Sequence, residues 1–460
     1  MKQLILFALS LSLVLGEVSG QTNDSLTIKE RNSNRPTIAL LRGPYLQVAT
    51  SNSIIIRWRT NVATRSRVRY GSEAGKLDKL TDDNALVTEH EVKLTQLQPE
   101  TKYFYSIGTT KDTLQGNEEN YFMTLPVVGS KGLYRIGVFG DPGLNSVNQY
   151  NVRDAFVKNL GNNYLNAWLV LGDNAYSDGT DAEYQAKFFN VYKDKLLKKY
   201  PLYPAPGNHD YHDVDFKSEY AQMNHTTAYY QNFTMPAKGE AGGVPSGTES
   251  FYSFDIGNVH FLSLDSYGME EKKYMLYDTT GPQAQWIKKD LAMNKNKDWV
   301  VAYWHHPPYT MGSHNSDEES ELGEIREKVL PILERYGVDL VLCGHSHVYE
   351  RSRLMKGYTG NEAAFNEKYN LSTSSALNDG TPDSAPYVKD ASNKGTVYVV
   401  AGSAGPVGGI QKSFPHAAMY YSNGSIGGAC LLEVQANKLE LKWICADGVI
   451  RDHFTIIKNK

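Results

Sequence analysis

Two hydrophobic patterns divide the chain. From Arg42 to Leu125, short runs of alternating apolar and polar residues are separated by turn residues, as in Ser53–Thr60 and Ser66–Gly71. Alternation with a period of two is typical of strands that bury one face. The pattern therefore predicts an N-terminal all-β sandwich over residues 38–126, with Trp58 on its inner face.

From Tyr134 onward, buried strands alternate with helical stretches. Strands are expected at 135–139, 167–171, 202–205, 259–264, 300–304, 339–342 and 396–400, and helices at 152–159, 184–198, 283–292 and 324–336. This order predicts a layered α/β domain over residues 132–460, a β-sheet sandwich flanked by helices. Residues 357–394 are rich in Asn, Ser, Gly and Asp without periodicity, which predicts a surface insertion.

The first 20 residues have the pattern of a signal peptide. Lys2 precedes an apolar run from Leu4 to Leu15, and small residues follow up to Gly20. The run is shorter than the ~20 residues of a membrane-spanning helix, and no later stretch approaches that length. We expect an exported protein, secreted or periplasmic, with no transmembrane segment.

Composition adds little to this picture. A hydrophobic fraction of 41%, a charged fraction of 21% and a net charge of -4 describe a soluble globular protein without an electrostatic reason to bind a nucleic-acid scaffold. Only three cysteines are present. Cys430 and Cys445 flank a predicted hairpin, so they either form a disulfide or remain as two unpaired core thiols.

Polar motifs follow five of the predicted strands. They are Gly140-Asp141-Pro142-Gly143, Gly172-Asp173-Asn174-Ala175-Tyr176, Gly207-Asn208-His209-Asp210, Trp304-His305-His306-Pro307 and Gly344-His345-Ser346-His347. Each motif alone would be an ordinary turn, but ligands of α/β sheets bind at strand ends, where all five stand. Carboxylate, amide, phenol and imidazole donors without a thiolate suit iron, manganese or zinc. Two ions ~3.5–4 Å apart would use more donors than one tetrahedral ion can.

The motifs in this order resemble the purple acid phosphatase family of the metallophosphoesterase (calcineurin-like phosphoesterase) superfamily. The resemblance covers nearly the whole chain after the signal peptide. Leu97–Tyr103 resembles a fibronectin type III pattern, in which the tyrosine hydroxyl ties down a corner, and many large members carry such a domain in front. Tyr176 is the distinguishing residue, because most relatives with the same five motifs lack a tyrosine there.

The resemblance implies a role for each motif residue. One ion, usually Fe(III), would be held by Asp141, Asp173, Tyr176 and His347. Asp173 would bridge to a second ion, Fe(II), zinc or manganese, which Asn208, His305 and His345 would hold. His209 and His314 would be catalytic residues that contact the substrate. His306 is expected to be packed or hydrogen-bonded, and the run Glu318, Glu319 and Glu321 to be a solvated acidic face.

The sequence thus predicts an exported acid phosphatase that hydrolyses small phosphomonoesters with hydroxide activated at a dinuclear metal centre. A phosphodiesterase acting on nucleotides or lipid head groups would use the same ligands. A non-catalytic surface-binding protein is the alternative outside the enzymes, and the complete ligand set argues against it.

Overall fold

The computed structural model describes residues 37–212, 225–267, 275–390, 392 and 394–459. The predicted signal peptide lies outside these residues. Residues Leu40–Lys460 form one compact unit. Among the described helices, none combines the length and the apolar character needed to cross a membrane.

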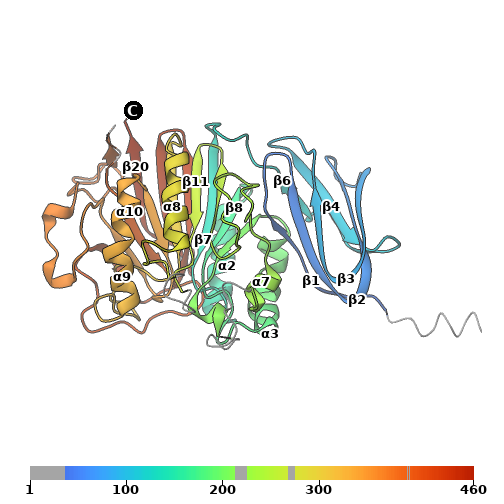
Figure 1. The fold of residues 1–460 in the computed structure, drawn as a ribbon, viewed down its shortest axis with the longest axis horizontal. Helices are drawn as coiled ribbons and strands as arrows, with labels where there is room; N and C mark the ends of the chain where they lie inside the picture. The colour runs from blue at the N-terminus through green and yellow to red at the C-terminus, as the bar shows by residue number, and fades with distance from the viewer. Residues whose placement is uncertain (1–36, 213–224, 268–274, 391, 393, 460) are drawn as a thin grey trace, which may run out of the picture. The chain divides into compact units, whose positions relative to one another are not determined.

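The N-terminal part is a six-stranded antiparallel sheet, drawn in blue in Figure 1. Its strands are β1 (Leu40–Gln47), β2 (Ile54–Gly71), β3 (Lys79–Leu94), β4 (Lys102–Gly108), β5 (Thr113–Gln115) and β6 (Tyr121–Met123). The first half of β2 pairs with β1 and its second half with β4, while β3 runs beside both halves. Trp58 is fully buried against His90, and the Tyr103 hydroxyl accepts a 3.0 Å hydrogen bond from the Gln98 amide. Both structural predictions are confirmed.

The rest of the unit contains two seven-stranded sheets. The first has the order β10 (Tyr252–Ile256), β11 (Val259–Ser263), β12 (Trp299–Trp304), β13 (Leu340–Cys343), β16 (Val397–Ala401), β14 (Tyr349–Ser352) and β17 (Met419–Asn423). The second has the order β15 (Tyr387–Lys389), β20 (Ile450–Lys458), β19 (Lys438–Cys445), β18 (Gly428–Gln435), β7 (Leu133–Phe139), β8 (Ala167–Leu171) and β9 (Leu202–Ala205). Strands β11, β12, β13 and β16 are parallel, as are β7, β8 and β9. Every predicted strand of the α/β part is present.

Side-chain alternation along β12 shows how the layers form. Val301 and Tyr303 belong to the core shared by the two sheets, whereas Val300, Ala302 and Trp304 belong to a second core beneath helices. These helices are α8 (Pro282–Met293), α9 (Ser320–Lys328) and α10 (Leu330–Arg335), seen beside the sheet in Figure 1. The strand is buried on both faces, which explains its continuous apolar sequence. The predicted sandwich of sheets flanked by helices is confirmed.

Three of the predicted helices differ from the structure in their bounds or their continuity. The helix expected at 152–159 is α2 (Val147–Leu160). The helix expected at 324–336 is divided into α9 and α10, because Pro331 lacks the amide proton that a continuous helix would use there. The helix expected at 184–198 is a series of short α and π turns. They are α3 (Asp181–Glu183), η1 (Tyr184–Phe189), α4 (Asn190–Tyr192) and η2 (Lys193–Leu197).

The remaining described helices are short: η3 (Asn208–Tyr211), α7 (Ala228–Asn232), η5 (Glu362–Ala364) and η6 (Glu367–Tyr369). The last two and β15 lie within the predicted insertion, whose side chains are mostly exposed or half-buried in the described residues. All three cysteines are buried and free. Cys430 lies opposite Trp443 and Cys445 opposite Gly428 across the β18–β19 pair, so the two thiols are not cross-strand partners.

Candidate metal centre

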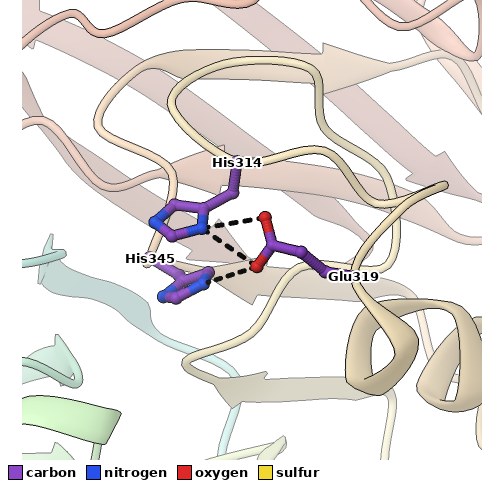
Figure 2. A group of neighbouring side chains, drawn as sticks. All are labelled: His314, Glu319 and His345. Atoms are coloured by element: carbon purple, nitrogen blue, oxygen red, sulfur yellow. Dashed lines mark hydrogen bonds and ion pairs between the residues drawn. The ribbon is translucent and has the colours of Figure 1, made fainter.

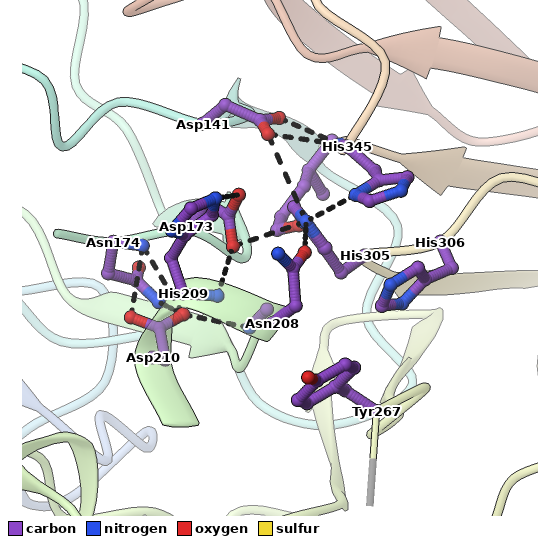
Figure 3. A network of polar contacts seen from close by, with 12 residues as sticks. Asp141, Asp173, Asn174, Asn208, His209, Asp210, Tyr267, His305, His306 and His345 are labelled. Carbon is purple, nitrogen blue, oxygen red and sulfur yellow. Dashed lines mark hydrogen bonds and ion pairs between the residues drawn. The ribbon is translucent and has the colours of Figure 1, made fainter. Parts of the chain in front are cut away.

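The parallel strands bring the five polar motifs to one place. Asp141 and Asp173 follow β7 and β8, Asn208 follows β9, His305 follows β12, and His345 and His347 follow β13. Figure 3 shows side chains from these loops pointing toward a common centre. All seven predicted ligands are connected there through short side-chain distances. Sequence order alone does not determine this meeting, because the motifs come from two different sheets.

Three of the seven side chains form one group of donors. The Tyr176 hydroxyl lies 3.0 Å from Asp141 Oδ1 and 3.2 Å from His347 Nε2. His347 Nε2 in turn lies 3.8 Å from Asp141 Oδ1. The Asp173 carboxylate also interacts with the Tyr176 hydroxyl.

The other donors surround His305. Its Nε2 lies 3.0 Å from Asn208 Oδ1, 3.2 Å from Asp173 Oδ1 and 3.2 Å from His345 Nδ1. The same nitrogen is 4.0 Å from Asp141 Oδ1, which connects the two groups. Asp173 therefore interacts with members of both groups, as a bridging carboxylate would.

A hydrogen bond fixes the orientation of His305. Its Nδ1 atom donates to the Leu171 carbonyl oxygen at 2.8 Å, at the end of β8. With Nδ1 engaged in this way, Nε2 is the ring nitrogen that faces the other donors. Metal-binding histidines in proteins are commonly held in this way by a backbone carbonyl.

The backbone at the centre adopts unusual conformations. Asp141, Asp173 and His345 have φ angles of 58°, 52° and 66°, in the left-handed region that residues other than glycine seldom adopt. A Cβ atom at Gly207 would collide with Asp173 Oδ1, and one at Gly344 would collide with Asp141 Oδ2. Such strain gathers at functional sites, where the surrounding fold holds it in place.

The electrostatics of the seven side chains suit cations. Burial raises the pKa of Asp141 well above its usual range, whereas for Asp173 burial is outweighed by His305, which lowers the pKa. Burial lowers the pKa of His345 to about 3 and that of His347 to about 4, so both rings are neutral near pH 7 with lone pairs available. Two buried carboxylates side by side are costly unless positive charge neutralises them. Oxygen and imidazole donors in two connected groups fit two metal ions of the iron, zinc or manganese type.

Asp210 connects two of the motif loops, and sequence reasoning did not assign it a role. Its Oδ2 accepts hydrogen bonds from the Gly207 amide at 2.7 Å and from Asn174 Nδ2 at 2.9 Å. Tyr184 donates to its Oδ1. Burial, with Asp173 adding to it, raises the pKa of Asp210 to about 6. Its position in the Gly-Asn-His-Asp motif is the sequence feature that could have indicated this role.

His209 lies beside Tyr176 and Asp173 and is only partly buried. Its ring packs 4.5 Å from that of Tyr176, its Nδ1 is 2.5 Å from the Ser177 carbonyl oxygen, and its Nε2 is 3.9 Å from Asp173 Oδ2. The side chain keeps 27% of its surface exposed, so it is only partly buried.

His314 and Glu319 also reach the centre, as Figure 2 shows. The His314 ring stacks on that of His345 with centroids 3.6 Å apart. Its Nδ1 donates to Glu319 Oε1 at 2.9 Å, and Glu319 Oε2 lies 3.5 Å from His345 Nε2. The expectation of a solvated acidic face was therefore wrong for Glu319. No local sequence signal distinguishes Glu319 from Glu318, because only the loop after β12 turns it inward.

His306 is buried, and its Nδ1 lies 2.8 Å from Ser266 Oγ. Tyr267 stacks on it with centroids 5.6 Å apart. This agrees with the packed role expected for His306. Tyr267, visible in Figure 3, is a neighbour of the centre that sequence reasoning missed.

Comparison with known proteins agrees with this geometry. The model of the calcineurin-like phosphoesterase family matches residues 134–349. The model of the purple acid phosphatase N-terminal domain matches residues 42–124. The chain therefore carries a calcineurin-like phosphoesterase domain and, before it, the N-terminal domain of purple acid phosphatases. Both matches imply a dinuclear metal centre, and the seven gathered donors fit one.

Two similar proteins from Arabidopsis thaliana are named purple acid phosphatases. Purple acid phosphatase 15 is 31% identical over 294 residues, which cover 58% of this chain and 50% of that protein. Purple acid phosphatase 23 is 29% identical over 370 residues, which cover 68% of this chain and 75% of that protein. The match to the first of these relatives thus spans half of its length.

Two solved structures share the fold. Purple acid phosphatase PPD1 from yellow lupin (Lupinus luteus) seeds superimposes with a TM-score of 0.66 at 18% identity, covering 90% of this chain and 74% of that one. The structure of PhoD superimposes with a TM-score of 0.64 at 13% identity, covering 93% and 92%.

Proposed function

We propose that this chain is an exported metal-dependent phosphatase that hydrolyses phosphomonoesters at a dinuclear centre. The observation that carries the proposal is the meeting of all seven donors, from five loops, in two groups that Asp173 connects. Asp141, Asp173, Tyr176 and His347 would hold one ion, Fe(III). Asp173, Asn208, His305 and His345 would hold Fe(II), zinc or manganese. Export rests on the signal-peptide pattern of residues 1–20.

When bound, the two ions would acidify the attacking water and neutralise the phosphoryl oxygens during in-line displacement. The chain's own residues supply orientation and protons. His209 is held by its Nδ1 hydrogen bond to the Ser177 carbonyl oxygen, so Nε2 is the ring nitrogen that would serve the substrate. In the imidazolium form, Nε2 would donate a proton to the departing oxygen of the ester.

His314 would contact the substrate from the opposite wall. Its Nδ1 is engaged by Glu319, so its Nε2 is the atom available to a phosphoryl oxygen. Because hydroxide attacks the phosphorus directly, the reaction needs no covalent phospho-enzyme. Neither His209 nor His314 acts as a nucleophile in this proposal.

The first experiment is metal analysis and visible absorption of the purified protein, followed by hydrolysis of p-nitrophenyl phosphate from pH 4 to 8. We expect two metals per chain, a visible band from Tyr176 bound to Fe(III), and activity against the monoester. Asp173→Asn should lose both metals and activity, while Asp178→Asn, an exposed change later in the same loop, should keep them. Protein that stays metal-free and inactive after reconstitution would contradict the proposal.

The ester class needs its own comparison. Rates on p-nitrophenyl phosphate and bis(p-nitrophenyl) phosphate should differ by at least tenfold in favour of the monoester. A preference for the diester would instead support a phosphodiesterase with the same metal ligands.

A further inference from the structure

Glu319 carries a fixed negative charge beside the candidate metal centre. Its Oε1 accepts hydrogen bonds from His314 Nδ1 and from the Asn315 amide, both at 2.9 Å. Its Oε2 lies 3.5 Å from His345 Nε2. The carboxylate is thus held from three sides, and Figure 2 shows it facing the two rings.

One imidazole ring separates this carboxylate from the second donor group. His345 has its Nε2 toward Glu319, and its Nδ1 lies 3.2 Å from His305 Nε2. His314 stacks on the same ring and would meet the phosphate of the substrate. A leaving group that extends along this wall would pass the Glu319 carboxylate.

Among the described residues, the recorded partners of the Glu319 carboxylate are His314, Asn315 and His345. Within the described part of the chain, the recorded partners of the His314, His345 and His347 side chains include no lysine or arginine. A second phosphate group there would face the Glu319 carboxylate. Repulsion between partly buried charges a few ångströms apart is weakly screened by salt.

We propose that Glu319 is a specificity-determining residue whose carboxylate favours phosphomonoesters with neutral or cationic leaving groups and disfavours polyanions such as pyrophosphate and nucleoside triphosphates. The proposal rests on the phosphatase function proposed above. The charge acts on the part of the substrate beyond the reacting phosphate. Its effect should therefore appear in the ratio between substrates more than in the rate on any one of them.

The experiment compares kcat/KM for pyrophosphate and for p-nitrophenyl phosphate in the metal-loaded protein and its variants. Glu319→Gln keeps the size and an oxygen acceptor for His314 but removes the charge. We expect it to raise the pyrophosphate to p-nitrophenyl phosphate ratio about five- to tenfold. Glu318→Gln and Glu321→Gln are matched controls from the same acidic run and should change the ratio less than twofold.

Glu319→Asp separates charge from positioning. It keeps the charge, so the ratio should stay within twofold of the unmodified protein even if both rates fall. An unchanged ratio in Glu319→Gln, an equal shift in the two control variants, or the same shift in Glu319→Asp would each overturn the proposal.

Equilibrium binding provides a second readout that needs no turnover. Calorimetric titration measures the Kd for tripolyphosphate and for inorganic phosphate. In Glu319→Gln, binding of tripolyphosphate should strengthen relative to binding of inorganic phosphate by the same five- to tenfold. If the protein hydrolyses no ester but shows this shift, the phosphatase function fails while the role of Glu319 stands. Binding of neither anion, or equal ratios in Glu319→Gln and the unmodified protein, would overturn the role itself.

Discussion

Tyr176 and His347 meet at the candidate metal centre, although 171 positions separate them, with the Tyr176 hydroxyl 3.2 Å from His347 Nε2. Burial and the carboxylates of Asp141 and Asp173 raise the pKa of the phenol well above its usual range. The phenol is therefore neutral unless a strongly charged cation stabilises its anion. Under the proposed function, Tyr176 would be the residue whose spectrum reports the bound metal directly.

Tyr176→Phe should remove the visible absorption band of the metal-loaded protein and lower its iron content, because the phenolate oxygen is lost while the ring remains. Absorption spectra and metal analysis on the same samples measure both effects. Tyr267→Phe is the matched control, since Tyr267 lies near the centre but stacks on His306. A band that survives in Tyr176→Phe would show that the phenol is not a ligand.

Asp210→Asn should loosen the two motif loops that the carboxylate joins. The neutral amide would accept the buried hydrogen bonds from the Gly207 amide and the Asn174 side chain more weakly than the carboxylate does. We expect the free energy of unfolding to fall by about 1–3 kcal/mol and metal affinity to fall by about tenfold or more. Denaturant unfolding and metal titration measure these quantities. A variant with full stability and unchanged metal affinity would contradict this role for Asp210.

His209→Asn should reduce kcat on a phosphomonoester by about 10²-fold or more, because general acid catalysis is lost while the metal ligands stay in place. Metal content should not change. The reduction should be smaller for esters with good leaving groups, which need less protonation. His212→Asn, which changes the histidine that packs beside His209, is the control and should reduce kcat less than threefold. Equal losses in both variants would remove His209 from the proton-transfer step.

Asp181→Asn tests how the N-terminal sheet is attached to the α/β part. Asp181 accepts from Arg42 at 2.9 Å and from Arg59 at 2.5 Å. Arg42 is buried, so removing the negative charge of Asp181 leaves the positive charge of the Arg42 guanidinium poorly compensated. We expect a loss of about 1–2 kcal/mol in the free energy of unfolding at pH 7. Glu73→Gln, in an exposed ion pair with Lys76, should cost less than about 0.5 kcal/mol.

The same variant has a defined pH dependence. Burial opposes ionisation of Asp181, but the hydrogen bond from Arg59 and the charge of Arg42 outweigh it and lower the pKa from 3.8 to about 2. A lowered carboxyl pKa contributes stability that is present above the unfolded-state value and is lost as the pH falls toward the folded-state value. The difference in Tm between the unmodified protein and Asp181→Asn should stay constant above pH 5 and shrink between pH 4 and 2. A difference that persists unchanged at pH 2 would assign the effect to packing.

Much of the fold follows from local pattern. The strands at 167–171 and 202–205 have the predicted bounds, because each is a short, continuous buried run, the pattern of a strand covered on both faces. The helix predicted at 184–198 was less accurate, since the π turns there depend on how Tyr184, Phe188 and Phe189 enter the core. Likewise, only the β18–β19 register decides that Cys430 and Cys445 are not opposite each other.

The sequence by itself determined the type and order of the donors, because each of the five motifs is a short turn whose chemistry is written in adjacent residues. The tertiary structure decided which donors meet, since two sheets must pack before Asp173 comes within 3.2 Å of His305. It also decided the neighbours without a motif of their own: Glu319 faces His314 and His345, and Tyr267 stacks on His306. These contacts depend on long-range packing, which places residues distant in sequence side by side. The sequence around each residue therefore does not indicate them.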